Sequence, residues 1–313
     1  MGYVFGLLAA LLFGANGSVV KVVLDSGLNP TQVTQLRTLG TAVIAGAILL
    51  VINRSAFRIS WRQVGIMAVL GVVGLALLQV TYAFAIQLLP VGIALLLEYL
   101  AVPAVALIGF IFLKERVKPR LWVAIACVVI GLGVVAQIWA STLNPLGVAM
   151  ALAAAATLSI YFLIGERQVT ATSPLAVAFW TSSFAALAWA PLSGWWTIDP
   201  AIAVAPVSLS GTLAGVIVPL WVPVLWLVVM GSFLPFLLSF SALGRLKATA
   251  GGIVASSEVI FAFVVAWLWL GEELTVFQVI GAAIVLVGIV LAQTSRSRVV
   301  DADLAIVEGQ RAV

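Results

Sequence analysis

Residues 91–117 read VGIALLLEYLAVPAVALIGFIFLKERV, and residues 249–275 read TAGGIVASSEVIFAFVVAWLWLGEELT. Each stretch contains an apolar run of about 20 residues, which is the length that crosses the hydrocarbon core of a bilayer as a helix. Each run carries one carboxylate, Glu98 or Glu258, and ends in an acidic turn. The first turn is also basic and the second has no cation, so the two runs are expected to end on opposite sides of a membrane.

The composition of the whole chain excludes a soluble protein. Of its 313 residues, 64% are hydrophobic and only 8% are charged, whereas soluble domains carry about 25% charged residues. The chain has no histidine, which removes Ser-His-Asp triads and histidine-bound zinc sites. Its single cysteine, Cys127, cannot form an intrachain disulfide. We therefore expect no enzymatic activity, no cofactor and no metal ion.

The hydropathy pattern predicts an all-α integral membrane protein with ten transmembrane helices. Proline-containing turns such as Asn29-Pro30 and Ser173-Pro174 separate several of them. Residues Thr197 to Val218 are expected to form a loop with a short interfacial helix. The predicted spans are Tyr3–Leu24, Thr31–Ile52, Gln63–Leu88, Val91–Leu113, Leu121–Trp139, Leu146–Gly165, Leu175–Trp195, Pro219–Ala242, Thr249–Leu270 and Thr275–Gln293.

The basic residues predict the orientation of these spans. With the N-terminus in the cytoplasm, 13 of the 15 Lys and Arg residues fall in inner loops or the tail, and the other two, Lys21 and Arg37, lie within spans. This distribution follows the positive-inside rule, so both termini are expected to be cytoplasmic. The chain is placed in the cell membrane as a multi-pass protein, which in a bacterium is the inner membrane. Residues 294–313 are polar and are expected to be a disordered cytoplasmic tail.

The chain also contains an internal repeat. Aligning Glu115 with Glu272 places Gly131 over Gly288 in the following span. Residues 1–143 and 144–293 are thus interpreted as two five-helix repeats. Because five is odd, the second repeat must be inverted in the membrane. Inverted repeats are typical of secondary transporters, which bind substrate where the two halves meet.

Several short motifs together resemble a known superfamily. They are Leu12-Phe13-Gly14-Ala15-Asn16 with Lys21, Pro30 with Arg37, Pro103 followed by Leu113-Lys114-Glu115-Arg116 and Gly131, and Leu270-Gly271-Glu272-Glu273-Leu274-Thr275 with Gly288. In these residues the chain resembles the EamA-type ten-helix exporters of the drug/metabolite transporter superfamily. It departs from the family pattern at Lys114, where a glycine is usual, and at Ile260, where a proline is common.

The resemblance implies a secondary transporter that exports small metabolites by alternating access. Amino acids are the expected substrates, aromatic ones among them; nucleobases, nucleotide sugars or drugs are the alternative within the superfamily. A channel or a membrane enzyme is the alternative of a different class. The expected partners are a small-molecule substrate and the lipid bilayer, with no nucleic acid, and the chain would act as a monomer or homodimer.

Four charged side chains within the predicted spans mark the candidate site, because a charge at the bilayer centre costs at least about 2.5–3.5 kcal/mol. A cation for a carboxylate and an acceptor for an ammonium group would suit a zwitterionic amino acid. The alternatives are that Lys21 extends to the interface, that Arg37 and Glu98 form a structural ion pair, and that backbone groups satisfy Glu258. The candidate cavity residues are Asn16, Lys21, Arg37, Gln79, Tyr82, Glu98, Tyr99, Trp180, Ser257 and Glu258.

Two mechanistic features remain open in the sequence. Proton-coupled export needs a carboxylate within the membrane, for which Glu98 and Glu258 are the candidates, whereas facilitated diffusion needs neither. Alternating access needs hinges, although proline and glycine are common in membrane helices for other reasons. The hinge candidates are Pro103, Pro191, Pro219, Pro223, Pro235, Gly251 and Gly252.

Overall fold

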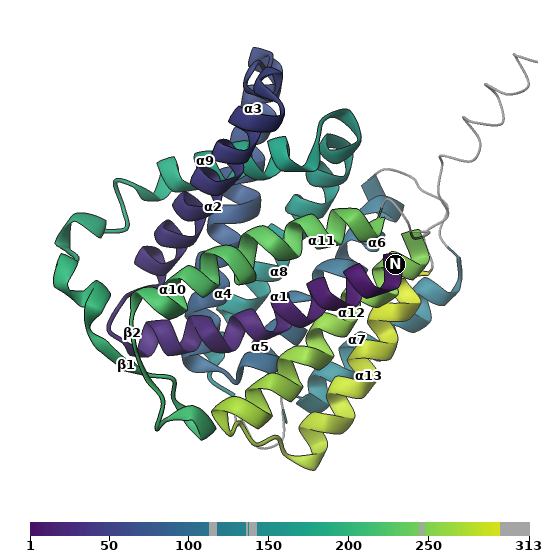
Figure 1. Cartoon of the computed structure of the whole chain (residues 1–313). Coiled ribbons are helices and arrows are strands. Elements are labelled where there is room, and N and C mark those ends of the chain that lie inside the picture. The colour runs from purple at the N-terminus through teal and green to yellow at the C-terminus, as the bar shows by residue number, and fades with distance from the viewer. Residues whose placement is uncertain (113–117, 136, 138–142, 244–245, 247, 295–313) are drawn as a thin grey trace, which may run out of the picture.

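The computed structural model describes residues 1–112, 118–135, 137, 143–243, 246 and 248–294, and these are almost wholly helical (Figure 1). The predicted basic turn around Glu115 and the predicted polar tail lie outside the described residues. The uninterrupted helices are α1 (Gly2–Asp25), α2 (Pro30–Ile52), α7 (Arg120–Val135), α8 (Pro145–Ala171), α9 (Pro174–Trp189) and α13 (Val276–Gln293).

The other helices are built from shorter segments. One consists of α3 (Trp61–Val69), η2 (Leu70–Ala76) and α4 (Leu77–Leu88), and a second consists of α5 (Val91–Glu98) and α6 (Ala101–Phe112). A third consists of α10 (Trp221–Val228), η6 (Val229–Phe233) and α11 (Leu234–Leu243). A fourth consists of α12 (Ala248–Val265) and η7 (Ala266–Leu270). The segments η2, η6 and η7 are π-helical. Such wider turns often occur at functional sites.

Local signals in the sequence explain where helices begin. The Asn29 side chain accepts from the Gln32 N–H at 2.8 Å, and the Gln32 side chain accepts from the Asn29 N–H at 3.0 Å. This reciprocal cap precedes a proline in the first turn of α2, where its missing N–H breaks no helical bond. Ser173 caps α9 in front of Pro174 in a similar way.

Within the described part of the chain, seven helical stretches are both long enough and apolar enough to cross a membrane. Three further apolar helices, Arg120–Val135, Pro174–Trp189 and Val254–Leu270, are shorter. A helix of 16 residues, such as α9, is about 24 Å long, which is less than the roughly 30 Å of the hydrocarbon core. The chain is therefore a helical protein with at least seven candidate spans, and the predicted count of ten stays a prediction.

The segment between α9 and α10 differs from its prediction. In place of a short interfacial helix it forms 3-10 turns and a small antiparallel hairpin, β1 (Pro206–Ser208) with β2 (Ile217–Pro219). The 3-10 turns are η3 (Trp195–Thr197), η4 (Pro200–Val204) and η5 (Gly211–Leu213), and a further one, η1 (Arg54–Phe57), follows α2. Pro206 lies opposite Pro219, so the ladder ends where neither residue has an N–H to donate.

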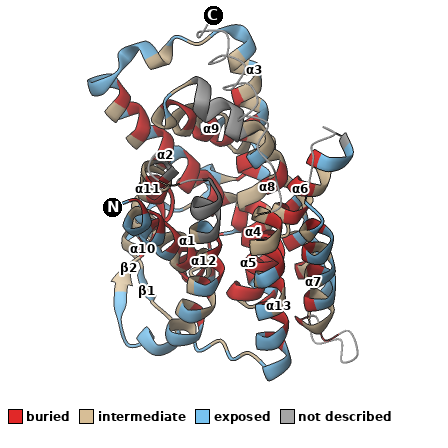
Figure 2. Cartoon of the chain, turned by 90° about the vertical axis from the view of Figure 1, so that its right-hand side faces the viewer, coloured by how far each residue is buried: buried red, intermediate tan, exposed pale blue. Residues whose placement is uncertain are grey.

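The helices pack in a defined set of pairs. α7 packs along α13, α1 packs against both α11 and α12, α2 packs against α9, and α8 packs against α4 and α5. The facing surfaces form a core that includes Val20, Ile86, Leu96, Leu227 and Ile289. Figure 2 shows buried residues on the inward surfaces and exposed ones on the periphery.

The periphery itself is rich in large apolar side chains. Val51, Trp61 and Val129 are 85%, 90% and 64% exposed. Exposed apolar surface on this scale would be unfavourable in water. A lipid environment removes that cost, in agreement with the composition.

Candidate functional site

The candidate site begins at the interruption between α5 and α6. α5 ends at Glu98, Tyr99 and Leu100 form a turn, and α6 begins at Ala101. The break leaves the Glu98 carboxylate at the C-terminal end of a half-helix inside the bundle. The helix dipole favours a positive charge at such an end.

Arg37 of α2 supplies the cation of the site and is only 6% exposed. Its Nε and Nη2 donate to Ser232 Oγ at 3.3 and 3.2 Å, and Nη2 also donates to the Gly231 carbonyl oxygen at 3.4 Å. Both acceptors lie on η6 and both are neutral. The guanidinium is therefore held in place without its charge being neutralised there.

Arg37 and Glu98 interact electrostatically. Among the described residues, however, neither forms a salt bridge, and none donates a hydrogen bond to the Glu98 carboxylate, whose residue is 8% exposed. A structural role for the interaction between Arg37 and Glu98 stays a prediction, but the two side chains do not form a direct salt bridge. Two opposite charges lie near one another inside the bundle with no counter-ion in direct contact.

A second carboxylate lies beside the first. The Tyr99 hydroxyl donates to Glu258 Oε2 at 2.5 Å and lies 3.3 Å from the Ala255 carbonyl oxygen. Glu258 of α12 also interacts electrostatically with Glu98. The partner given for the Glu258 carboxylate is thus a tyrosine hydroxyl from the α5–α6 break, whereas the predicted alternative was a backbone group.

Uncharged polar groups complete this cluster. The Tyr82 hydroxyl of α4 interacts electrostatically with Arg37, Glu98 and Glu258. Asn16 of α1 lies against Gly231, next to the carbonyl that accepts from Arg37. The side-chain oxygens of Asn16 and Gln79 are buried and have no hydrogen-bond partner in the described part of the chain.

Three predicted site residues lie elsewhere or are otherwise engaged. Lys21 Nζ lies 2.5 Å from Glu272 Oε1 in a salt bridge, and the extension of this side chain to the interface stays a prediction. The Trp180 indole donates to the Ala56 carbonyl at 3.1 Å and packs against Phe179, so it belongs to a cluster beside η1. The Ser257 hydroxyl donates to the Val254 carbonyl of its own helix at 2.5 Å.

The hinge candidates occupy several kinds of position. Pro103 and Pro223 lie in the first turns of α6 and α10, Pro191 follows α9, and Pro219 ends β2. Gly251 and Gly252 fall within the backbone of α12. Pro235 is the second residue of α11, one residue beyond the end of the π-helical η6 inside a continuous helix, so it interrupts a bonded turn.

At one end of the bundle, hydrogen bonds from the hairpin and a salt bridge connect neighbouring helices. Thr212 Oγ1 lies 3.0 Å from the Leu268 carbonyl oxygen and 3.1 Å from that of Trp269, and the Trp269 indole donates to the Leu209 carbonyl at 2.9 Å. Beside this contact, the Glu272 carboxylate joins Lys21 of α1 to the Val91 N–H of α5, the latter at 2.8 Å.

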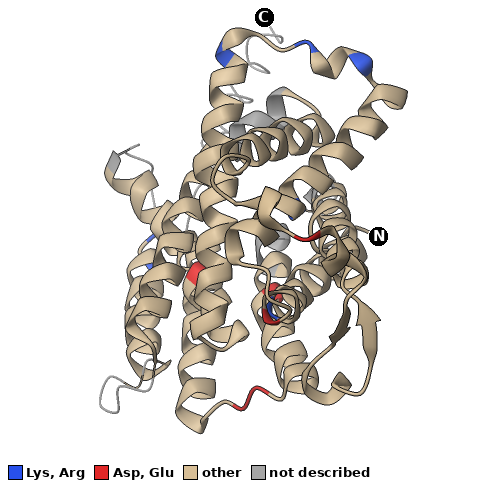
Figure 3. Cartoon of the chain, turned by 90° about the vertical axis from the view of Figure 1, so that its left-hand side faces the viewer, with Lys and Arg blue, Asp and Glu red and all other residues tan. Residues whose placement is uncertain are grey.

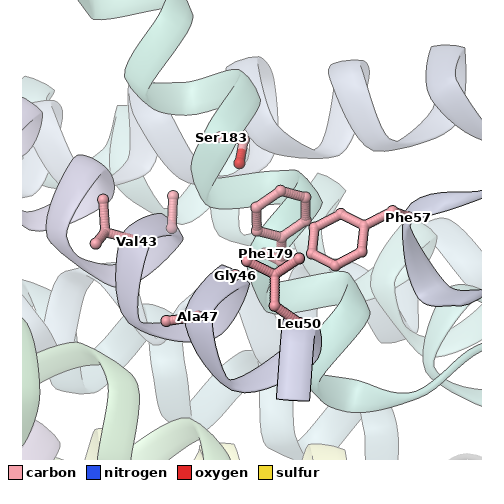
Figure 4. Close-up of a pocket in the computed structure, with 8 residues that line it drawn as sticks. Val43, Gly46, Ala47, Leu50, Phe57, Phe179 and Ser183 are labelled. Atoms are coloured by element: carbon pink, nitrogen blue, oxygen red, sulfur yellow. The ribbon is translucent and has the colours of Figure 1, made fainter. Parts of the chain in front are cut away.

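A cavity of about 470 Å³ lies away from the charged cluster. Figure 4 shows its lining from α2, η1 and α9: Val43, Gly46, Ala47, Leu50, Phe57, Phe179 and Ser183, with Ala42 beside them. Val43 and Leu50 are 61% and 52% exposed. This groove opens on the apolar periphery, and Ser183 is its one polar lining residue, so its chemistry suits hydrocarbon rather than a charged metabolite.

Sequence reasoning did not identify Ser232, Gly231 and Glu272 as site or linking residues. Serine is common in membrane helices, so composition alone gives Ser232 no special status. A usable signal was Pro235, because a proline has no N–H for the carbonyl four residues earlier. That carbonyl belongs to Gly231, which accepts from Arg37.

Two curated proteins that are similar to this chain are named as exporters. The Threonine/homoserine exporter RhtA of Salmonella typhimurium (strain SL1344) is 31% identical over 220 residues, 66% of this chain and 64% of the relative. The chain thus matches slightly less than two thirds of that protein's length. The Threonine/homoserine exporter RhtA of Escherichia coli (strain K12) is 29% identical over 247 residues, 74% of each chain.

The fold has a solved counterpart. One crystal structure aligns with 93% of this chain, and the alignment covers 96% of the chain in that crystal structure. The TM-score is 0.60 and the sequence identity is 19%, so the likeness is one of fold alone. The apolar helices make the chain a multi-pass membrane protein. Residues 1–137 and 145–294 match the EamA-like transporter family, and the chain belongs to this family.

Proposed function

We propose that this transporter exports amino acids by alternating access, with the substrate bound in the charged cluster around Arg37 and Glu98. The observation that carries this proposal is that the two charges are buried, oppositely signed and not in direct contact. Each is costly to bury alone. A zwitterion would neutralise both, with its carboxylate on Arg37 and its ammonium on Glu98 at the dipole-favoured end of α5.

The proposed mechanism rests on two inverted halves, residues 1–143 and 144–293. The family match falls in two segments of similar length, 1–137 and 145–294. In this scheme α1 corresponds to α8, α11 to α4 and α12 to α5–α6. The packing of α1 on α11 and α12, and of α8 on α4 and α5, fits a two-fold axis between the halves.

The contact between α7 and α13 supports the proposed two-fold relation at the level of single residues. A Cβ built on Gly131 would lie 2.8 Å from the Gly281 carbonyl oxygen and 2.7 Å from Val285 Cγ2. One built on Gly288 would lie 2.8 Å from the Ala124 carbonyl oxygen and 2.7 Å from Val128 Cγ2. Both contacts of Gly131 recur for Gly288 at one offset in sequence, which relates Gly131 to Gly288, Ala124 to Gly281 and Val128 to Val285, as expected if the helices are related copies.

We extend the proposal to ten spans with both termini in the cytoplasm. In Figure 3 several Lys and Arg segments lie at the top of the view and others lie at the left and near the centre, whereas an acidic loop lies at the bottom. The positive-inside rule then assigns the top to the cytoplasm. The end tied by the hairpin and by Glu272 would face outward.

For the substrate, the relatives named as threonine/homoserine exporters favour a small polar amino acid. The position of Trp180 outside the charged cluster removes one of the groups that would favour an aromatic substrate. Nucleobases, nucleotide sugars and drugs remain the alternative class. We assign any proton coupling to Glu258, because its carboxylate already has a protein partner in Tyr99 and is less available to a substrate.

Counterflow in proteoliposomes tests the proposal. Vesicles preloaded with unlabelled compound are offered the same compound with a radiolabel, across a panel of L-threonine, L-homoserine, aromatic amino acids, a nucleobase and a nucleotide sugar. We expect exchange of at least one amino acid and none of the nucleotide sugar. Exchange only of non-amino acids would refute the assigned substrate class, and empty vesicles supply the background.

A further inference from the structure

The Arg37 guanidinium is held by a single irregular turn of the neighbouring helix. Ser232 Oγ accepts from Nε and Nη2, and the Gly231 carbonyl accepts from Nη2. The turn is π-helical and is followed by Pro235, which cannot donate to the Gly231 carbonyl four residues earlier. The sequence of this turn thus leaves a backbone acceptor and a hydroxyl for the arginine.

This arrangement keeps two charges apart that would otherwise combine. A guanidinium near a buried carboxylate ordinarily forms a bidentate pair, because their geometries match. In Arg37 the Nε and Nη2 groups are engaged on η6, which leaves the two N–H donors of Nη1 without a partner among the described residues. The remaining donors can bind a carboxylate that comes from outside the protein.

The turn itself is fixed in position by close packing. A Cβ added to Gly231 would collide with the side-chain amide of Asn16 and lie 3.4 Å from Trp226 Cζ3. Ser232 is 2% exposed. Because η6 lies directly against α1, the two acceptors have little freedom to follow Arg37 if the guanidinium moves.

From these contacts we infer that Ser232 is a positioning residue: it holds Arg37 away from Glu98 and thereby makes the site select substrates with a free carboxylate. The inference deepens the proposed function and rests on it. Without the hydroxyl, Arg37 loses two of its three hydrogen bonds and is free to pair with Glu98. With Arg37 paired to Glu98, the site would have no cation available to a substrate and would lose its preference for a free carboxylate.

The test compares an amino acid with its methyl ester, which keeps the ammonium group and lacks the carboxylate. In reconstituted protein, inhibition of counterflow by L-threonine and by L-threonine methyl ester gives an acid-to-ester affinity ratio; if another amino acid of the panel exchanges better, that acid and its ester are used. For Ser232→Ala we expect this ratio to fall at least about tenfold, or 1.4 kcal/mol. Ser232→Thr, which keeps a hydroxyl, should retain the ratio.

Two further variants distinguish the positioning of Arg37 by Ser232 from general damage to the folded protein. Thr181→Val removes another buried hydroxyl, one that lies 2.7 Å from the Val177 carbonyl oxygen of its own helix, and it should leave the ratio unchanged. Pro235→Ala restores an N–H that competes for the Gly231 carbonyl, so it should lower the ratio in the same direction as Ser232→Ala. It also keeps the test valid if Ser232→Ala does not fold.

The outcomes distinguish this inference from the proposed function. If the native protein exchanges no amino acid, the proposed function fails and the inference fails with it. If the native protein exchanges an amino acid while Ser232→Ala and Pro235→Ala both keep the native ratio, only the inference is overturned. A fall in maximal rate with an unchanged ratio would also overturn it, because that result indicates a structural role.

Discussion

At the scale of single residues, the central feature is a buried arginine bound only by neutral acceptors. The contrast with Lys21 is direct, because that lysine has a carboxylate at 2.5 Å. Lys21 is also partly exposed, at 29% for its side chain, so it costs less to bury. An arginine that is more deeply buried and yet lacks a counter-ion is better explained by a ligand than by stability.

Replacing Arg37 should therefore abolish amino-acid exchange. We expect Arg37→Gln to lower kcat/KM for counterflow at least about 30-fold, because losing one partner of a buried charge contact costs about 2–5 kcal/mol. The measurement is initial-rate counterflow in proteoliposomes at equal protein content. Arg62→Gln, at an exposed arginine, serves as the matched control, and equal loss in both variants would contradict the role of Arg37.

The two carboxylates should separate substrate binding from proton coupling. Glu258→Gln should preserve counterflow but remove the response of net transport to an imposed pH gradient, because a neutral amide can still accept from Tyr99 and cannot bind a proton. Glu98→Gln should reduce counterflow itself, since it removes the partner of the ammonium group. If each variant keeps the native response to the gradient, coupling through these carboxylates is excluded.

The sequence could predict that the charged residues within apolar spans lie near one another, because burying a single charge in the bilayer is unfavourable unless another polar group or a ligand compensates it. The structure brings Arg37, Tyr82, Glu98 and Glu258 within electrostatic reach of one another. Their role in binding stays a prediction. Trp180 was not predictable in the same way, because an indole within an apolar segment can face lipid, core or cavity at similar cost.

At the scale of elements, the seam between α7 and α13 depends on small residues. Backbone carbonyls of one helix approach the glycines of the other, as at Gly131 with Gly281 and at Gly288 with Ala124. Close approach of this kind drives helix association in membranes, where the hydrophobic effect between helices is absent. The seam is thus sensitive to any added side-chain volume.

Large substitutions in this seam should destabilise the folded protein. For Gly131→Leu and Gly288→Leu we expect similar losses of at least about 1–3 kcal/mol from overpacking, seen as a lower midpoint of thermal unfolding in detergent. Gly65→Ala, at a glycine with open space around it, should have no such effect. A large loss for one seam glycine and none for the other would argue against the two-fold relation.

The positions of most helices could be predicted because their apolar runs and caps are local signals, and the Asn29–Gln32 cap of α2 is an example. The π-helical turns could not, because their extra residue per turn is set by packing against other helices rather than by propensity. The hairpin was missed because Thr197 to Val218 is apolar without regular alternation. Its strands are only three residues long.

At the scale of the whole molecule, the hairpin and Glu272 hold one end of the bundle closed. The link between Thr212 and η7 joins the hairpin to the end of the α12–η7 helix, while Lys21 and Glu272 join α1 to the loop that follows η7. In the proposed topology these contacts close the outer side. Export by alternating access requires that they break in each cycle.

Weakening this closure should expose the central cluster from outside. In a Cys127→Ala background with Asn16→Cys as a reporter, Thr212→Val combined with Glu272→Gln should raise the labelling rate by an impermeant maleimide several-fold in intact cells. Thr197→Val, which loses a hydroxyl that lies 2.7 Å from the Gly194 carbonyl oxygen, should leave labelling unchanged. Equal labelling in all variants would mean that these contacts do not control access.

The pairing of α7 with α13 has a consequence for how the chain is made. α7 belongs to the first half of the sequence, but its partner α13 is synthesised only after α8 to α12. Until then the face of α7 that carries Gly131 has only lipid or an insertion factor to cover it. Assembly of the first half therefore finishes only when α13 has been made, and a chain stopped before Val276 should be degraded as an unpaired intermediate.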